Sequence, residues 1–140
     1  MAFDILKPIR RYIDGNPSVR RVADDIELTS ELVLLVRTMF ADGELKPEEF
    51  DNFAKLCRTA FGIPPEDMDR VLDYLKDFAY EIDAAKAAAM FTELPEERKR
   101  ALLLHMLSIA RSDHEFHSDE AELIRRTATM LGVSIGDLPR

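Results

Sequence analysis

Apolar residues recur with helical spacing along almost the whole chain, and no segment alternates apolar and polar residues as a strand would. Gly and Pro interrupt this pattern: Gly62 follows one helical segment, Pro64 and Pro65 begin another, and Gly132 ends the last. The pattern predicts an all-α fold, a bundle of about seven helices.

The same pattern of apolar, capping and helix-breaking residues predicts several helix boundaries. The segment 17–40 fits either one long helix or two helices, with a capping break at Leu28-Thr29-Ser30. Pro47 is expected to open the next helix. Asp83 is expected to cap a short alanine-rich helix that extends to about position 92, and Ser118 to cap the last helix.

Length and composition exclude several classes of protein. A chain of 140 residues fits one domain, large enough to bury a core without disulfides. Its single cysteine, Cys57, excludes an intramolecular disulfide and a cysteine-rich zinc site. A net charge of −8 argues against a nucleic-acid partner. Because the sequence shows neither a membrane-spanning run nor a signal peptide, we expect a cytoplasmic protein without stable membrane insertion.

The charge is unevenly distributed along the chain. Residues 1–21 carry a net charge of +3, and the remainder carries −11. We therefore expect a basic N-terminal helical extension over residues 1–27 and a helical domain over residues 28–140, together forming one compact fold. The extension is expected to dock on its own acidic body; a second subunit, anionic lipid or plain solvation are the alternatives.

A shift of 71 positions superposes two acidic loops of the sequence, which predicts two helix–acidic loop–helix units. Gly62 and Gly132, which end the second helix of each unit, are 70 positions apart, so one residue has been gained or lost after Glu49. The matching acids are Asp42 with Asp113, Glu44 with Glu115, Glu48 with Asp119, and Glu49 with Glu120.

Each loop places two carboxylates in a turn and two more at a helix start, an arrangement of oxygen ligands that suits a hard divalent cation such as calcium or magnesium. The first loop resembles the second half of an EF-hand, with Glu49 as its bidentate ligand. Thr38 and Phe40 stand where the first acidic ligands belong, so a true EF-hand is excluded. The candidate metal ligands are Asp42, Glu44, Glu48, Glu49, Asp113, Glu115, Asp119 and Glu120.

The same acids have a purely structural interpretation. Carboxylates in the first turn of a helix interact favourably with the helix dipole without any metal, which accounts for Glu48, Glu49, Asp119 and Glu120. The turn acids are not needed for capping. Both interpretations remain open on the sequence alone.

The other candidate functional side chains are the histidines and the cysteine. His114 and His117 lie beside the acids of the second loop and could form a zinc, nickel or copper cluster, but the first loop has no histidine at either equivalent position. A solvated loop is the simpler interpretation. His105 is expected to be a half-buried core residue, and Cys57 a small buried apolar one.

No catalytic motif is present in the sequence. It has no glycine-rich phosphate loop, no G-x-S-x-G and no H-E-x-x-H. We therefore expect a protein without catalytic or cofactor-binding residues that is not an enzyme; a small metal-dependent hydrolase is the remaining enzymatic alternative.

The paired loops carry a family resemblance. Residues 34–63 and 102–133 resemble the two halves of the TerB family, the tellurite-resistance-associated domain, and a similar domain forms the N-terminal part of DjlA-type membrane co-chaperones. The similarity spans residues 28–133. Its signature is a helix ending in A-D-G-E-L before an acidic helix start, and it falls on Asp42, Gly43, Glu44 and Glu49, and on Asp113, Glu115 and Glu120.

The resemblance implies an all-α fold of two pseudo-repeated units, an acidic surface, a divalent-metal site at the loops, and an association with tellurite and other stress responses without enzymatic activity. The second copy departs from the pattern, with His114 in place of glycine and Arg111-Ser112 in place of small residues. A matched second site is therefore less well supported.

Taken together, the sequence predicts a non-enzymatic TerB-like binding module. Its acidic loops would bind a divalent cation weakly, on the order of 10⁻⁴–10⁻³ M, or present a negative face to a protein partner. The alternative is a structural or homo-oligomerising helical domain, whose acids only cap helices and maintain solubility.

Overall fold

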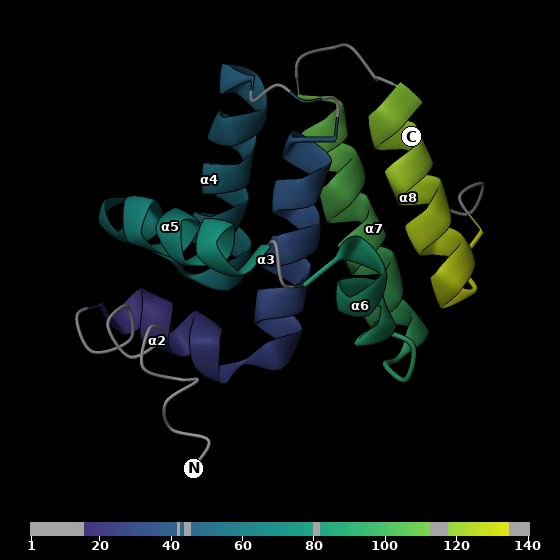
Figure 1. The fold of residues 1–140 in the computed structure, drawn as a ribbon, viewed down its shortest axis with the longest axis horizontal. Coiled ribbons are helices and arrows are strands. Elements are labelled where there is room, and N and C mark those ends of the chain that lie inside the picture. Colours follow the sequence, from purple (N-terminus) through teal and green to yellow (C-terminus); the bar gives the residue numbers. More distant parts are fainter. Residues whose placement is uncertain (1–15, 42, 44–45, 80–81, 113–117, 135–140) are drawn as a thin grey trace.

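The computed structural model describes residues 16–41, 43, 46–79, 82–112 and 118–134. No strand occurs among these residues, which confirms the all-α class (Figure 1). The helices are α2 (Pro17–Asp24), α3 (Ile26–Met39), α4 (Pro47–Phe61), the 3₁₀ helix η1 (Pro65–Asp67), α5 (Met68–Ala79), α6 (Ala84–Ala89), α7 (Glu96–Ala110) and α8 (Ser118–Leu131).

The segment 17–40 forms two helices, and they meet at Asp25. The carboxylate of Asp25 accepts a hydrogen bond from the Leu28 amide at 3.1 Å and so caps α3. The break predicted at Leu28-Thr29-Ser30 is wrong, because these residues are buried within α3. The hydroxyl of Thr29 does not cap a helix there but donates to the carbonyl of Val22 in α2.

Asp83 caps α6 as predicted, accepting a hydrogen bond from the Lys86 amide at 2.8 Å. The α-helix ends at Ala89, before the predicted end. The amides of Met90 and Phe91 bond to carbonyls three residues earlier, so the chain continues in tighter turns.

The two predicted units are confirmed as the helix pairs α3–α4 and α7–α8, which we call the first and second hairpins. Their first helices end alike: Phe40 has φ −101° and ψ 7°, and Arg111, which lies 71 positions later, has φ −96° and ψ 3°. Each amide bonds to carbonyls two and four residues earlier. Equivalent positions therefore have the same local geometry.

The second helices of the two hairpins bury equivalent residues. Phe53 and Ile124 are buried, as are Cys57 and Ala128, and both pairs are 71 positions apart. Gly62 and Gly132 follow the helices and are 70 apart, so the additional residue of α4 lies after Cys57.

In Figure 1, α3 and α7 lie side by side at the centre and run in the same direction, with α4 beside α3 and α8 beside α7. Both hairpins therefore turn at the same end of the molecule, at the top of the view. Helix α3 is the central element, because 11 of its 14 residues are buried and it also contacts α2, α5 and α6.

Helix α2 belongs to the same core, since Val19 and Val22 are completely buried. Its N-cap, Asn16, accepts hydrogen bonds from the amides of Ser18 and Val19. The side-chain amide nitrogen of Asn16 donates to Asp67 at 3.0 Å, which connects the start of α2 to η1. Residues 1–15 of the predicted extension lie outside the described residues. No helix among the described residues is long and apolar enough to span a membrane.

The left-handed glycines that end the hairpins give a first prediction. Gly132 has a φ of +72°, and a Cβ there would meet no atom within 4 Å, so Gly132→Ala isolates the backbone strain. We expect a loss of about 1–2 kcal/mol in the free energy of unfolding. Gly132→Asn should lose less, because Asn tolerates this conformation. Urea denaturation measures both, and equal stability of the alanine and asparagine variants would contradict the explanation.

Candidate functional site

The described candidate metal ligands lie at the end where the hairpins turn, and they form two pairs that differ in burial. Glu48 and Asp119 are exposed, whereas Glu49 and Glu120 are completely buried. Equivalent carboxylates of the two hairpins are therefore exposed or buried alike. Six further candidates lie outside the described residues: Asp42, Glu44, Asp113, Glu115, His114 and His117.

The buried pair lies on the apolar faces of its helices. Glu49 precedes Phe53 and Cys57 by four and eight residues, and all three are completely buried. Glu120 precedes Ile124 and Ala128 at the same spacing, and those two are buried as well. This spacing can be read from the sequence. It distinguishes Glu49, which lies on the apolar face, from Glu48, although the capping argument treated the two acids alike.

Burial determines which interactions can stabilise the charge of each carboxylate. The exposed acids Glu48 and Asp119 fit the capping interpretation, because a hydrated carboxylate in the first turn interacts favourably with the helix dipole. Glu49 and Glu120 have given up hydration, so their charge requires hydrogen-bond donors or a cation in its place.

The described residues contain no group of three or more His, Cys, Asp or Glu side chains close enough to hold a metal ion. Glu49 and Glu120 are thus not assembled with other described acids into a ligand set. A metal site at this end would have to include the turn acids.

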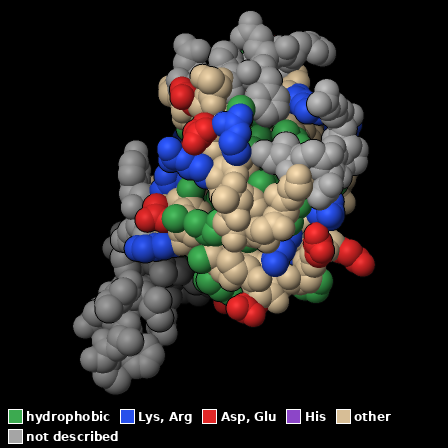
Figure 2. Space-filling model, turned by 90° about the vertical axis from the view of Figure 1, so that its right-hand side faces the viewer, with side chains coloured by type: hydrophobic (Ala, Val, Ile, Leu, Met, Phe, Trp, Pro, Cys, Tyr) green, Lys and Arg blue, Asp and Glu red, His purple; other side chains and the backbone are tan. Residues whose placement is uncertain are grey.

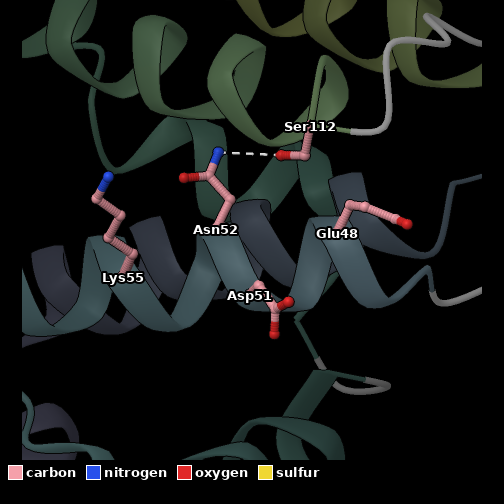
Figure 3. Close-up of a pocket in the computed structure, with 5 residues that line it drawn as sticks. All are labelled: Glu48, Asp51, Asn52, Lys55 and Ser112. Atoms are coloured by element: carbon pink, nitrogen blue, oxygen red, sulfur yellow. Dashed lines mark hydrogen bonds between the residues drawn. The ribbon is translucent and has the colours of Figure 1, made fainter.

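A wide, shallow pocket opens beside the acidic end, between α4 and the end of α7 (Figure 3). In Figure 3, the carboxylate of Glu48 points away from Asn52. The five lining residues are Glu48, Asp51, Asn52, Lys55 and Ser112.

Asn52 fastens this part of α4 to the second hairpin. Its amide nitrogen donates to the carbonyl of Ser108 at 2.9 Å and to the hydroxyls of Ser108 and Ser112 at 2.8 and 3.0 Å. Ser112 follows α7, so the contact secures the end of α7 beside α4. The equivalent residues of the other hairpin, Leu123 and Ala41, have no such polar groups, and the sequence analysis did not single out Asn52.

A second cluster of ionisable groups lies between α3 and α7, and the sequence analysis missed it. Glu31 is completely buried; it accepts a hydrogen bond from Arg98, and its carboxylate lies 2.5 Å from Nδ1 of His105. Arg98 also donates to Glu27 at 2.8 Å. Its guanidinium lies over the ring of Phe91, 5.2 Å from the centroid. We call Glu27, Glu31, Arg98 and His105 the Glu31 network.

His105 is half-buried, as predicted, with 24% of its side chain exposed. Its ring packs against that of Phe61 in a T-shaped arrangement, with 5.6 Å between centroids. The available signal for the network was Glu31 itself, a carboxylate enclosed by the apolar residues of segment 32–36 and by Leu28.

Cys57 is buried, as predicted, and behaves as a small apolar side chain. Burial, and then the negative charge of Glu31, raise the pKa of its thiol from 9.0 to about 12. The thiol is therefore protonated and unreactive at neutral pH.

The Glu31 network predicts a non-additive mutational cycle. Arg98→Leu leaves the buried carboxylate of Glu31 without its guanidinium, and we expect it to lower the free energy of unfolding by about 3 kcal/mol. Adding Glu31→Leu removes that uncompensated charge and should restore most of the loss. Denaturant unfolding of both variants tests this, and additive losses would contradict it.

The thiol gives a prediction for pH. The pKa of Cys57 is higher in the folded state than in the unfolded state, so its contribution to stability is complete below pH 9 and lost between pH 9 and 12. We expect the free energy of unfolding of Cys57→Ala to fall less steeply over this range than that of the unmutated chain. Native protein at pH 8 should react with a thiol reagent only as fast as it unfolds, and immediate labelling would contradict the assignment.

A family model described as tellurite resistance protein TerB matches residues 19–140, nearly the whole chain, and confirms the resemblance. No curated protein and no solved structure matches the chain.

Proposed function

The chain belongs to the TerB family, and we propose that it is a non-enzymatic binding module whose acidic hairpin turns bind a divalent cation, calcium or magnesium. From the family description we also propose a cytoplasmic role in the response to tellurite or a related stress.

The observation that carries this proposal is the complete burial of Glu49 and Glu120 at equivalent positions of the two hairpins. Two carboxylates withdrawn from water at one end of the molecule require hydrogen-bond donors or positive charge around them. A hard cation held together with the turn acids is one such source of positive charge. Helix capping alone does not require their burial, since Glu48 and Asp119 occupy the same first turns in an exposed position.

Binding is expected to be weak, with a dissociation constant on the order of 10⁻⁴–10⁻³ M. Fewer acidic ligands are available than in an EF-hand, because Thr38 and Phe40 occupy the positions of its first two.

The alternative of a continuous negative face for a basic partner is less well supported. Figure 2 views the molecule from the side that carries α8, and there the described acidic side chains are mixed with Lys and Arg. Glu122 of α8 pairs with Arg125 at 2.7 Å and with Arg126 at 3.0 Å, which neutralises its charge locally.

Thermal unfolding of the chelator-treated chain, with and without 10 mM calcium, magnesium, manganese or zinc, tests the proposal. This concentration is about 10 to 100 times the expected dissociation constant, so a cation that binds only the folded state adds about 1.4–2.7 kcal/mol, which raises the midpoint by several degrees. Glu49→Gln with Glu120→Gln should abolish this shift.

The matched control is Asp51→Asn with Glu122→Gln. It changes the net charge by the same amount at another pair of equivalent positions on α4 and α8, where both acids are not buried. The control variant should keep the response to cations.

The same experiment separates the proposal from the structural alternative. If Glu49 and Glu120 serve a cation, the cation should raise the midpoint of the unmutated chain but not that of the glutamine variant. If they only cap helices, the replacement should destabilise the metal-free chain by about 0.5–1 kcal/mol per site, and no cation should shift the midpoint. That second outcome would contradict the proposal.

A further inference from the structure

We propose that the Glu31 network makes the first hairpin pair with the second, and prevents two first hairpins or two second hairpins from different copies of the chain from pairing with each other. A chain that contains two similar hairpins can mispair. Each hairpin resembles its own partner, so it could also dock on the same hairpin of a second copy. The network lies where α3 and α7 meet.

The network is built from residues that differ between the hairpins. The shift of 71 positions relates Glu27 to Arg98, Glu31 to Leu102, and Leu34 to His105. Glu27 and Arg98 are thus equivalent positions that contact each other, and they carry opposite charges. The buried carboxylate of α3 has an apolar equivalent in α7, and the imidazole of α7 has an apolar equivalent in α3.

Pairing of two first hairpins would place like charges together. In the same geometry, Glu31 would face Glu27 and Leu34 of the second copy, and Glu27 would face Glu27 of that copy. The contact would hold four carboxylates and no cation, with both Glu31 side chains buried. Burial of a carboxylate without a positive partner is strongly unfavourable.

Pairing of two second hairpins fails for the opposite reason. Leu102 would face Arg98 and His105 of the second copy, and the two Arg98 side chains would face each other. Two guanidinium groups would be partly buried without a carboxylate. Only the pairing of a first with a second hairpin combines Glu27 and Glu31 with Arg98 and His105.

Two apolar pairs of the central helices do not discriminate between these pairings. Leu32 and Leu103 are buried at equivalent positions, as are Leu35 and Met106, and each pair is similar in size and chemistry. At these positions shape and hydrophobicity are compatible with all three pairings, whereas the charges of the Glu31 network are not.

The test uses the full chain with Cys57→Ser and Glu27→Cys, which moves the single thiol to position 27. Because positions 27 and 98 are equivalent and in contact, two such thiols meet when first hairpins pair. Exchange of hairpins between chains in the proper pairing places the thiol beside residue 98 instead. The chain is refolded at about 1 mM, near the effective concentration of linked hairpins, and treated with a short thiol–thiol cross-linker.

With Glu31, Arg98 and His105 present, we expect few covalent dimers. Addition of Glu31→Leu, Arg98→Leu and His105→Leu should raise the dimer yield by about tenfold, because buried unpaired charge no longer opposes like pairing. An unchanged yield in this variant, shown by circular dichroism to be folded, would overturn the proposal.

If the triple variant does not fold, Glu31→Gln with Arg98→Gln removes the central charges with little change in size. It should raise the dimer yield several-fold, and no increase would overturn the proposal. The matched control replaces three charges of α8 outside the network, Glu122, Arg125 and Arg126, each by Gln. It should leave the yield unchanged, and an equal increase there would also overturn the proposal.

Discussion

The fold depends on the burial of one charge, the carboxylate of Glu31, between the two central helices. Helix α3 is enclosed by its neighbours, and at its middle the chain places a group that requires water or a positive partner. Both direct partners of Glu31, Arg98 and His105, come from α7. The first hairpin therefore cannot bury its central helix without loss unless the second hairpin is docked, so the two repeats form one cooperative unit rather than two independent ones.

The same contact determines where the acidic turns lie. Glu27 pairs with Arg98, its own equivalent, so α3 and α7 are aligned without an offset along their axes. Because the helices run in the same direction, both hairpins turn at one end of the molecule (Figure 1). Glu49 and Glu120 are consequently brought to the same end, and Asn52 secures α4 to the end of α7. The alignment of α3 and α7 at the Glu31 network thus determines that the two halves of the proposed cation site lie at the same end of the molecule.

Features that depend on local sequence could be predicted: the helical class, the repeat, the cap at Asp83 and the half-burial of His105. The break between α2 and α3 was misplaced because Asp25 and the segment 28–30 both offer capping groups, and the choice rests on the contact of Thr29 with α2. Glu31 was missed because its partners are 67 and 74 residues away in the sequence. The difference between Glu48 and Glu49 was predictable, since adjacent residues of a helix face directions about 100° apart and only Glu49 follows the apolar stripe.

The pattern of agreement between the two hairpins separates two kinds of role. At the turning end the described acids of the two copies agree: one is exposed and one buried in each, and each buried acid precedes two buried apolar residues at the same spacing. Where the central helices meet, the copies differ at the positions that carry charge. Agreement is what two sites with the same task require, and complementary difference is what two surfaces that must fit each other require. The burial of the equivalent acids is therefore a property that each hairpin has by itself, whereas the Glu31 network forms only between the two hairpins.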